Sequence, residues 1–261
     1  MLILITGAGS GIGKDTAIAL AKKGHHVIAT THRQAQAEAL IEWCAIENIA
    51  MVVFKLDITL FEDRAKIVDY ELDVLINNAA IGESGSLAEI PVDKIRNNFE
   101  VNLFSTIELS QLALKPMMKR DSGKVIFISS LAGRIAMPFL APYSMSKFAL
   151  SAGVDALRQE LSEVTKKVHV CLVEPGSYHT GFNQRNIAKK FEWMGKDSYF
   201  HQIKNKIRRN ENRMFNILEV KSTKSIVEKI IEACESKNPK LRYAAPWWQT
   251  TGVQVMRIFG K

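Results

Sequence analysis

The sequence predicts an α/β fold in which helices cover both faces of a doubly wound parallel sheet. Short apolar, β-branched segments alternate with amphipathic segments along most of the chain. The short segments are continuously apolar, which is typical of strands that are buried on both faces of a parallel sheet. A glycine-rich turn directly follows the first of them. Strands that alternate with helices in this manner form βαβ units.

Seven strands are predicted, at 2–6, 26–31, 51–57, 72–77, 124–129, 168–174 and 241–244. Amphipathic helices are predicted at 15–23, 34–46, 93–119 and 143–165. The alternation is lost only at 178–221, where helical, basic and aromatic residues stand in place of a strand and helix. We interpret residues 1–261 as a single domain with an insertion at about 178–221.

Composition excludes several classes of protein. Of the 261 residues, 47% are hydrophobic and 24% are charged, which is typical of globular chains and excludes disordered, collagen-like and coiled-coil proteins. Cys44, Cys171 and Cys234 lie far apart, so neither a disulfide framework nor a zinc site is predicted, and a reducing cytoplasmic setting is expected. No apolar stretch approaches the ~20 residues of a membrane span.

The net charge of +8 is unevenly distributed. Residues 185–213 contain nine Lys or Arg residues and three acidic residues, so most of the excess lies in this segment. A basic segment can bind nucleic acid, but this one has no zinc-finger or RNA-recognition signature, and its aromatic residues have the spacing of a core. We therefore expect no nucleic-acid partner and no metal.

The glycine-rich turn spans residues 6–13, with the sequence TGAGSGIG. Glycines let the backbone approach a phosphate, and the following helix offers free N–H groups and the positive end of its dipole. A Walker A loop is excluded by Ala8 and Asp15, and GxGxxG finds no register. The pattern that fits is TGxxxGxG, although an ordinary strand-to-helix turn can also be rich in glycine.

This turn resembles that of the short-chain dehydrogenase/reductase family in its single-domain, Rossmann-type form. Further motifs follow in the order of that family and cover nearly the whole chain: Asn77-Asn78-Ala79-Ala80, which resembles NNAG except at Ala80; Asn102; Ser130, thirteen residues before Tyr143; Tyr143 and Lys147 as YxxxK; and Pro175-Gly176 with Thr180. YxxxK alone is a weak signal, but the order and spacing of the whole set are specific.

The resemblance implies a nicotinamide dinucleotide cofactor. Its predicted contacts are Gly7, Ser10, Gly11, Ile12, Thr31, His32, Arg33, Asp57, Ile58, Asn78, Ala79, Tyr143, Lys147, Pro175, Gly176 and Thr180. Asp57 corresponds to the family's adenine-binding aspartate, and it can also cap the segment that starts at Thr59.

NADP(H) is predicted as the preferred cofactor, with NAD(H) as the alternative. An acidic residue at the end of the second strand would bind the ribose 2′-hydroxyl and repel a 2′-phosphate. That strand ends with Thr31, His32 and Arg33, so no acid is present and Arg33, together with His32, can pair with phosphate. Ser10 is a counter-signal, because many NADP-preferring relatives have a basic residue there. Arg33 can also be an ordinary solvated residue.

Four residues are predicted to be catalytic. Tyr143 and Lys147 lie one helical turn apart on one face. A phenol with a pKa near 10 is a poor base at neutral pH, and a neighbouring ammonium together with an oxidised nicotinamide favours the phenolate. Ser130 would bind the same substrate oxygen. The resemblance implies that Lys147 also holds the nicotinamide ribose and that Asn102 positions a water linking Lys147 to solvent.

We therefore predict an NADP(H)-dependent oxidoreductase that transfers a hydride between the cofactor and an alcohol or carbonyl group of a hydrophobic small molecule. The alternative is a catalytically silent dinucleotide-sensing protein with the same fold, although such proteins usually lose the Tyr or Lys that this chain keeps. Each catalytic candidate alone also has an ordinary structural explanation, but the four together in register predict catalysis.

The insertion is predicted to cover the substrate. Its apolar residues indicate a hydrophobic substrate, and its basic residues either solvate the outer faces of helices or meet an acidic group. These apolar residues are Phe182, Phe191, Trp193, Met194, Tyr199 and Phe200. Trp247 and Trp248 either close the same pocket or pack on the last strand.

A homodimer or homotetramer is also predicted. The helices at 93–119 and 143–165 carry more apolar surface than one sheet face covers, and Phe148, Ala152, Ala156 and Gln159 extend the stripe of the second helix. The small residues Ala149, Ser151, Ala152 and Gly153 would let a partner helix approach closely. Relatives commonly pair these helices across a twofold axis, for which a self-complementary patch is required. Burial within the monomer is the alternative.

Overall fold

The computed structural model describes residues 1–260, apart from the side chain of residue 187, and it confirms the predicted doubly wound sheet. Seven parallel strands lie in the order β3-β2-β1-β4-β5-β6-β7. They are β1 (Leu2–Ile5), β2 (His26–Thr31), β3 (Val52–Lys55), β4 (Val74–Asn77), β5 (Gly123–Ile128), β6 (Val168–Pro175) and β7 (Arg242–Ala245). The strand order reverses between β1 and β4, and the carboxyl ends of strands at such a point form a natural ligand crevice.

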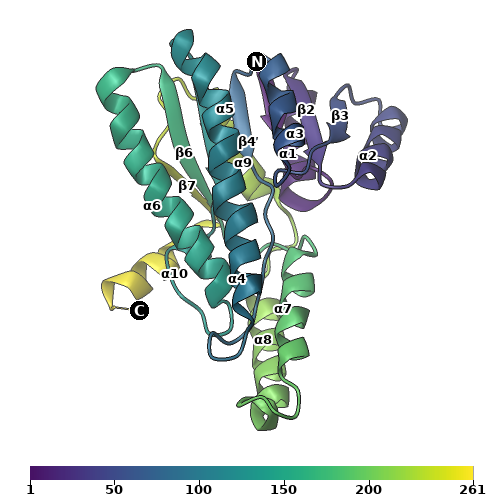
Figure 1. The fold of residues 1–261 in the computed structure, drawn as a ribbon, viewed down its shortest axis with the longest axis vertical. Coiled ribbons are helices and arrows are strands. Elements are labelled where there is room, and N and C mark those ends of the chain that lie inside the picture. The colour runs from purple at the N-terminus through teal and green to yellow at the C-terminus, as the bar shows by residue number, and fades with distance from the viewer. Residues whose placement is uncertain (261) are drawn as a thin grey trace.

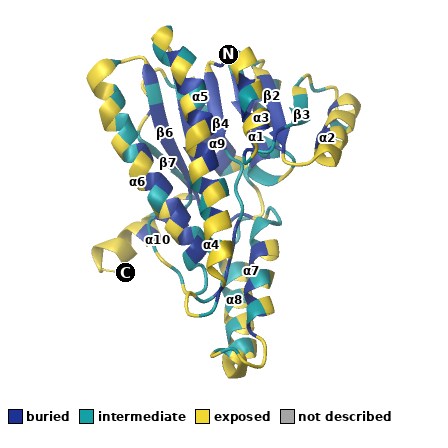
Figure 2. Cartoon of the chain, viewed as in Figure 1, coloured by how far each residue is buried: buried dark blue, intermediate teal, exposed yellow. Residues whose placement is uncertain are grey.

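Two apolar layers hold the helices on the sheet. Along β1, Ile3 and Ile5 face one layer and Leu4 faces the other, as the alternation of side chains in a strand requires. Helices α1 (Gly11–Lys22), α2 (Gln34–Ile46) and α9 (Lys224–Glu235) pack on the first face. Helices α5 (Ser105–Lys119) and α6 (Ala141–Val164) cover the second. Figure 1 shows the two layers, and Figure 2 shows the buried strands between half-exposed helices.

The predicted helix at 93–119 is interrupted. The structure has α4 (Val92–Phe99), a π-helical turn (Glu100–Phe104) and then α5. Side chains support this turn: the hydroxyl of Thr106 donates to the carbonyl oxygen of Val101 at 3.1 Å, and that of Ser105 donates to the carboxylate of Glu100 at 3.0 Å. The sequence predicts a single amphipathic helix because both halves carry an α-helical pattern; the extra residue of the π-helical turn only changes the phase between them. π-helical turns are frequent at functional sites, and this one carries Asn102.

The insertion forms two helices that project beyond the carboxyl ends of the strands (Figure 1). They are α7 (Phe182–Trp193) and α8 (Lys204–Leu218), with a short 3-10 turn (His201–Ile203) before α8. A parallel bridge between Tyr178 and Val220 joins the two ends of the insertion. We call residues 182–218 the lid. After β7, α10 (Trp247–Ile258) lies at the same edge of the sheet.

Smaller elements complete the chain. They are α3 (Phe61–Ala65), with a 3-10 turn (Lys66–Asp69) after it, and a further 3-10 turn (Leu131–Gly133) between β5 and α6. Among residues 1–260, no helix is both long and apolar enough to cross a membrane.

Candidate active site

A cavity of about 740 Å³ lies at the carboxyl ends of the strands, where the strand order reverses. Most of the residues predicted to bind cofactor or substrate line it. They are Gly7, Ser10, Gly11, Ile12, His32, Asp57, Ile58, Asn78, Ala79, Ser130, Tyr143, Lys147, Pro175, Gly176 and Thr180. Thr31, Arg33 and Asn102 are not among the lining residues.

The glycine turn is shaped by a close approach to the chain that follows β4. Gly7 has φ +67°, and a Cβ atom there would lie 2.8 Å from the Cα of Ala79. The Asn78 side chain donates to the carbonyl oxygens of Thr6 at 2.8 Å and Gly7 at 3.1 Å, which ties the two turns together. α1 begins at Gly11 immediately afterwards, so its free N–H groups face the cavity. This cradle fits the diphosphate of a dinucleotide.

Two of the residues predicted to bind the adenosine end of the cofactor do not border the cavity. Thr31 is buried and its hydroxyl donates to the carbonyl oxygen of Arg33 at 3.0 Å, so it lies beneath the cavity wall. Arg33 is exposed at the start of α2 and does not border the cavity, whereas His32 and Gln36 do. Gln36 could have been predicted from the sequence, because it lies in the first turn of α2, the helix that follows β2.

Asp57 is held by a compact set of donors. Its carboxylate accepts from the backbone N–H of Thr59 at 3.0 Å and from the hydroxyl of Thr59 at 2.7 Å, and it lies 3.1 Å from Nε2 of His32. Burial raises the pKa of Asp57, but the bonds from Thr59 and the neighbouring His32 outweigh burial and lower it below its usual value. Asp57 therefore holds the turn at Thr59 and borders the cavity, and its contact with adenine stays a prediction.

Three of the four predicted catalytic side chains, those of Ser130, Tyr143 and Lys147, meet at the inner wall of the cavity. Ser130 follows β5, and its Oγ accepts from the N–H of Ala132 at 3.1 Å. Tyr143 and Lys147 come from the first turns of α6. The Lys147 ammonium donates to the carbonyl oxygen of Ile128 at 2.8 Å and lies 5.8 Å from the centroid of the Tyr143 ring.

Desolvation dominates the titration of this pair. Burial raises the pKa of Tyr143 to about 12, with a smaller opposite effect from the hydroxyl of Ser130. Burial lowers the pKa of Lys147 to about 7. The sequence predicts that the Lys147 ammonium together with an oxidised nicotinamide lowers the pKa of Tyr143, whereas in the protein without nicotinamide burial raises it. A buried site destabilises both the phenolate and the ammonium, so Tyr143 is a neutral phenol at pH 7.

Asn102 lies behind the cavity wall, where it joins the chain after β4 to the first turns of α6. Its Oδ1 accepts from the N–H of Ile81 at 2.9 Å, and its Nδ2 donates to the carbonyl oxygen of Ile81 at 2.9 Å and to the hydroxyl of Ser146 at 3.0 Å. Sequence reasoning missed Asn98, one turn earlier, whose amide donates to the carbonyl oxygen of Pro142 at 3.1 Å and to the same Ser146 hydroxyl. Together the two asparagines fix the start of the helix that carries Tyr143.

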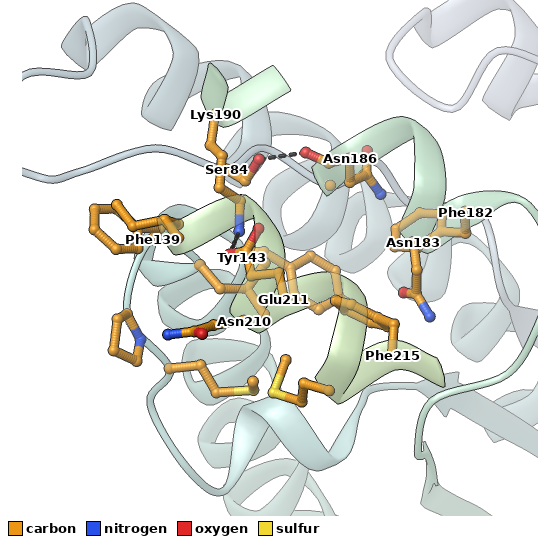
Figure 3. Close-up of a pocket in the computed structure, with 16 residues that line it drawn as sticks. Ser84, Phe139, Tyr143, Phe182, Asn183, Asn186, Lys190, Asn210, Glu211 and Phe215 are labelled. Atoms are coloured by element: carbon orange, nitrogen blue, oxygen red, sulfur yellow. Dashed lines mark hydrogen bonds and ion pairs between the residues drawn. The ribbon is translucent and has the colours of Figure 1, made fainter. Parts of the chain in front are cut away.

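A second hollow, of about 300 Å³, adjoins the cavity at Tyr143 and Phe182 (Figure 3). Of the predicted lid aromatics only Phe182 lines it; Phe191 and Met194 are buried in the lid, and Tyr199 is exposed. Trp248 borders the large cavity, whereas Trp247 is exposed. Sequence reasoning did not single out the other apolar lining residues, which come from the loop before α6 and from α8: Met137, Pro138, Phe139, Leu140, Ile207, Met214 and Phe215.

Comparison with known proteins agrees with this geometry. A family model described as short chain dehydrogenase matches residues 1–190. The uncharacterized oxidoreductase YusZ of Bacillus subtilis is 32% identical over 216 residues, covering 79% of this chain and 75% of that protein. The NADPH-dependent 3-dehydrocapnine reductase of Ornithobacterium rhinotracheale is 32% identical over 250 residues, covering 92% and 86%. A crystal structure of a short-chain dehydrogenase from Streptomyces avermitilis has a TM-score of 0.79 at 26% identity, covering 99% and 92%.

The cradle provides a direct test of cofactor binding. We expect Gly7→Ala to weaken dinucleotide binding by at least tenfold. Alanine would have to adopt φ +67°, which is unfavourable for a residue with a Cβ, and its methyl group would collide with Ala79. Gly195→Ala is the control, since a Cβ at Gly195 has no neighbour within 4 Å in the described chain. Fluorescence titration with NADPH measures both variants, and unchanged binding by Gly7→Ala would contradict the assignment of the cradle.

Proposed function

Because the chain belongs to the short-chain dehydrogenase/reductase family of NAD(P)-dependent oxidoreductases, we propose that it transfers a hydride between NADP(H) and the carbonyl or alcohol carbon of a hydrophobic small molecule. The observation that carries the proposal is the position of Tyr143. This phenol borders both the dinucleotide-sized cavity and the smaller apolar hollow beside it. A proton donor between a cofactor site and an apolar pocket is what carbonyl reduction requires.

The protein's own residues can supply the proton that the carbonyl oxygen receives and can stabilise the negative charge that develops during the reaction. The nicotinamide, when bound, supplies or accepts the hydride. Tyr143 is protonated at neutral pH, so it can give its proton to a carbonyl oxygen as negative charge develops there. The Ser130 hydroxyl borders the same cavity and can donate to that oxygen. Lys147 is held by the carbonyl oxygen of Ile128 beside the phenol, and in its protonated form it stabilises the phenolate that remains.

This arrangement favours an enzyme over a silent dinucleotide sensor. A sensor needs the cradle at Gly7 and can use Lys147 to hold the ribose, but it has no use for a phenol placed between the two pockets beside that lysine. Burying Lys147 carries a desolvation cost, which its low pKa reflects. Retaining such a group is typical of a site that uses it.

Loss of the phenol hydroxyl tests the mechanism. We expect Tyr143→Phe to lower kcat by about 10²–10⁴-fold while NADPH still binds, because only the proton donor is removed. Tyr70→Phe, near the amino end of β4, is the matched control and should turn over normally. Stopped-flow NADPH oxidation with hydrophobic aldehydes and ketones provides the measurement, and a Tyr143→Phe enzyme with wild-type turnover would refute the role of this residue.

NADP(H) preference is supported by the residues that follow β2. Thr31, His32 and Arg33 include no carboxylate to repel a 2′-phosphate, and the N-terminus of α2 with exposed Arg33 lies next to the cavity-lining His32. His32 lies 3.1 Å from Asp57, so the exposed guanidinium of Arg33 is the group that we expect to pair with a 2′-phosphate. The Ornithobacterium relative is described as NADPH-dependent, which supports the same preference.

We expect NADPH to bind at least tenfold more tightly than NADH, a difference of about 1.4 kcal/mol. Arg33→Ala should remove most of this difference and leave NADH binding nearly unchanged, since NADH lacks the phosphate. Lys119→Ala controls for the loss of a positive charge, because Lys119 is exposed at the opposite edge of the sheet, just before β5. Equal dissociation constants for the two cofactors in the wild-type protein would exclude the preference.

We further propose that the enzyme is a cytoplasmic homo-oligomer. The three cysteines are buried and free, which supports a reducing compartment. On the outer side of α5 and α6, Ile107 and Phe148 are exposed, and Ala152, Gly153 and Ala156 form a flat exposed strip. Ser151 does not belong to this strip: it is buried and its hydroxyl lies 2.8 Å from that of Ser129.

Light scattering should therefore report at least twice the chain mass of 29.3 kDa at micromolar protein. Ala152→Arg places a charge in the centre of the strip and should dissociate the assembly. Ala39→Arg, at an exposed position on α2, is the matched control and should leave the mass unchanged. A monomer mass for the wild-type protein throughout this concentration range would rule out the proposal.

A further inference from the structure

The apolar hollow beside Tyr143 contains a buried ion pair. Lys190 of α7 donates to the carboxylate of Glu211 of α8, and both residues line the hollow (Figure 3). Their side chains are 4% and 12% exposed, so both charges are largely removed from water. Most of the surrounding lining is apolar. A buried pair of this kind stabilises a fold weakly or not at all, because desolvation offsets the attraction.

The pair is incompletely satisfied. Oε1 of Glu211 accepts from Lys190, but the buried Oε2 has no hydrogen-bond partner among the residues that the structure describes. Neighbouring Lys189 does not help, because its ammonium lies 3.2 Å from the carbonyl oxygen of Gly82 and 3.4 Å from the carboxylate of Glu83. An unpaired buried polar atom costs about 1–3 kcal/mol, and more when it is charged.

A second polar group of the hollow has the same property. Asn186 lies one helical turn before Lys190 and is buried, and its backbone carbonyl accepts from the hydroxyl of Ser84. Its Nδ2 has no partner within the described part of the chain. Gly82 makes room for this amide, since a Cβ there would lie 2.2 Å from Nδ2. Two side chains that line this largely apolar hollow thus each hold an unpaired buried atom, an acceptor on Glu211 and a donor on Asn186.

We propose that Glu211 is a specificity residue that binds a hydroxyl group of the substrate, at a distance from the carbonyl or alcohol that reacts at Tyr143. This inference rests on the proposed oxidoreductase function. A hydroxyl donates to the free Oε2 of Glu211, which an apolar group or an ether cannot do. Lys190 and Glu211 together are neutral, so the hollow favours a neutral donor over an ammonium or a carboxylate, each of which would add an unbalanced buried charge. The substrate class is a hydroxylated, otherwise apolar ketone or its alcohol.

A purely structural role makes a different prediction. If the pair only joins α7 to α8, its loss loosens the lid and weakens every ligand to a similar degree. If Glu211 binds the distal hydroxyl, its loss removes the preference for hydroxylated ligands and leaves apolar ligands bound as well as before or better. The relative affinities of matched ligands therefore separate the two roles.

The test uses the 261-residue protein saturated with NADP⁺. Calorimetry measures the dissociation constants of secondary alcohols built on one unbranched octyl chain, whose far end is a methyl, methoxy, hydroxyl, ammonium or carboxylate group. The wild-type complex should bind the hydroxyl compound about tenfold more tightly than the methoxy compound, the usual size of a hydrogen bond to a charged group. Equal binding of these two compounds, or tighter binding of the ammonium or carboxylate compound, would overturn the proposal.

Two variants locate the effect. Lys190→Met/Glu211→Leu replaces the whole pair by apolar groups, so that no charge is left unpaired, and should abolish the hydroxyl preference. Glu211→Gln keeps the shape and should reduce the preference severalfold. Lys224→Met/Glu228→Leu removes an exposed pair on α9 and is the matched control. A hydroxyl preference that survives in both Glu211 variants would refute the assignment.

Turnover separates this inference from the function on which it rests. Wild-type enzyme and the control variant Lys224→Met/Glu228→Leu should both oxidise the methyl compound with NADP⁺, because Tyr143 and the lining of the hollow are unchanged in both. Turnover without hydroxyl preference would refute the role of Glu211 alone. Hydroxyl preference in binding without turnover of any compound would refute the proposed reaction and retain the binding site.

Discussion

The site depends on a contact between two turns, one after β1 and one after β4. Thr6 and Asn78 hold them together: the Thr6 hydroxyl accepts from the N–H groups of Asn78 and Ala79 at 3.0 Å, and the Asn78 amide donates back to Thr6 and Gly7. These strands are neighbours at the position where the sheet order reverses. The two turns approach so closely that there is no space for a Cβ at Gly7, which is why this position requires glycine. Residues from several other strand ends can then converge on one cavity.

Desolvation sets the chemistry within that cavity. The same burial shifts Tyr143 and Lys147 in opposite directions, because it penalises a negative phenolate and a positive ammonium alike. The protein alone therefore presents a neutral phenol, which is the form that can donate a proton to a carbonyl. Two asparagines behind the wall, Asn98 and Asn102, hold the helix start in place, and the π-helical turn directs Asn102 inward. The geometry of the proton donor thus depends on residues that do not line the cavity.

The lid adds polar groups to an apolar surface. Few of the basic residues in 185–213 face the hollow, and Lys190 does so only as a partner of Glu211. Others support the lid itself: Lys204 donates to the carbonyl oxygens of Phe191 and Met194, and the Arg208 guanidinium lies 4.6 Å from the centroid of the Phe191 ring. The concentration of positive charge in this segment is therefore in part structural.

The sequence by itself determined the fold class, the strands and the residues whose spacing along the chain is their signal. Buried parallel strands are continuously apolar, and the glycine turn, Asn102, Ser130, Tyr143 and Lys147 follow one another at fixed intervals, so local pattern is sufficient. Tertiary structure alone decided which polar atoms remain unpaired and which way desolvation shifts each pKa. Lys190 and Glu211 are 21 residues apart on two helices, and no periodicity relates them. The burial of a side chain and the pairing of its polar atoms depend on surfaces that meet only after folding. They therefore cannot be predicted from the pattern of residues along the chain.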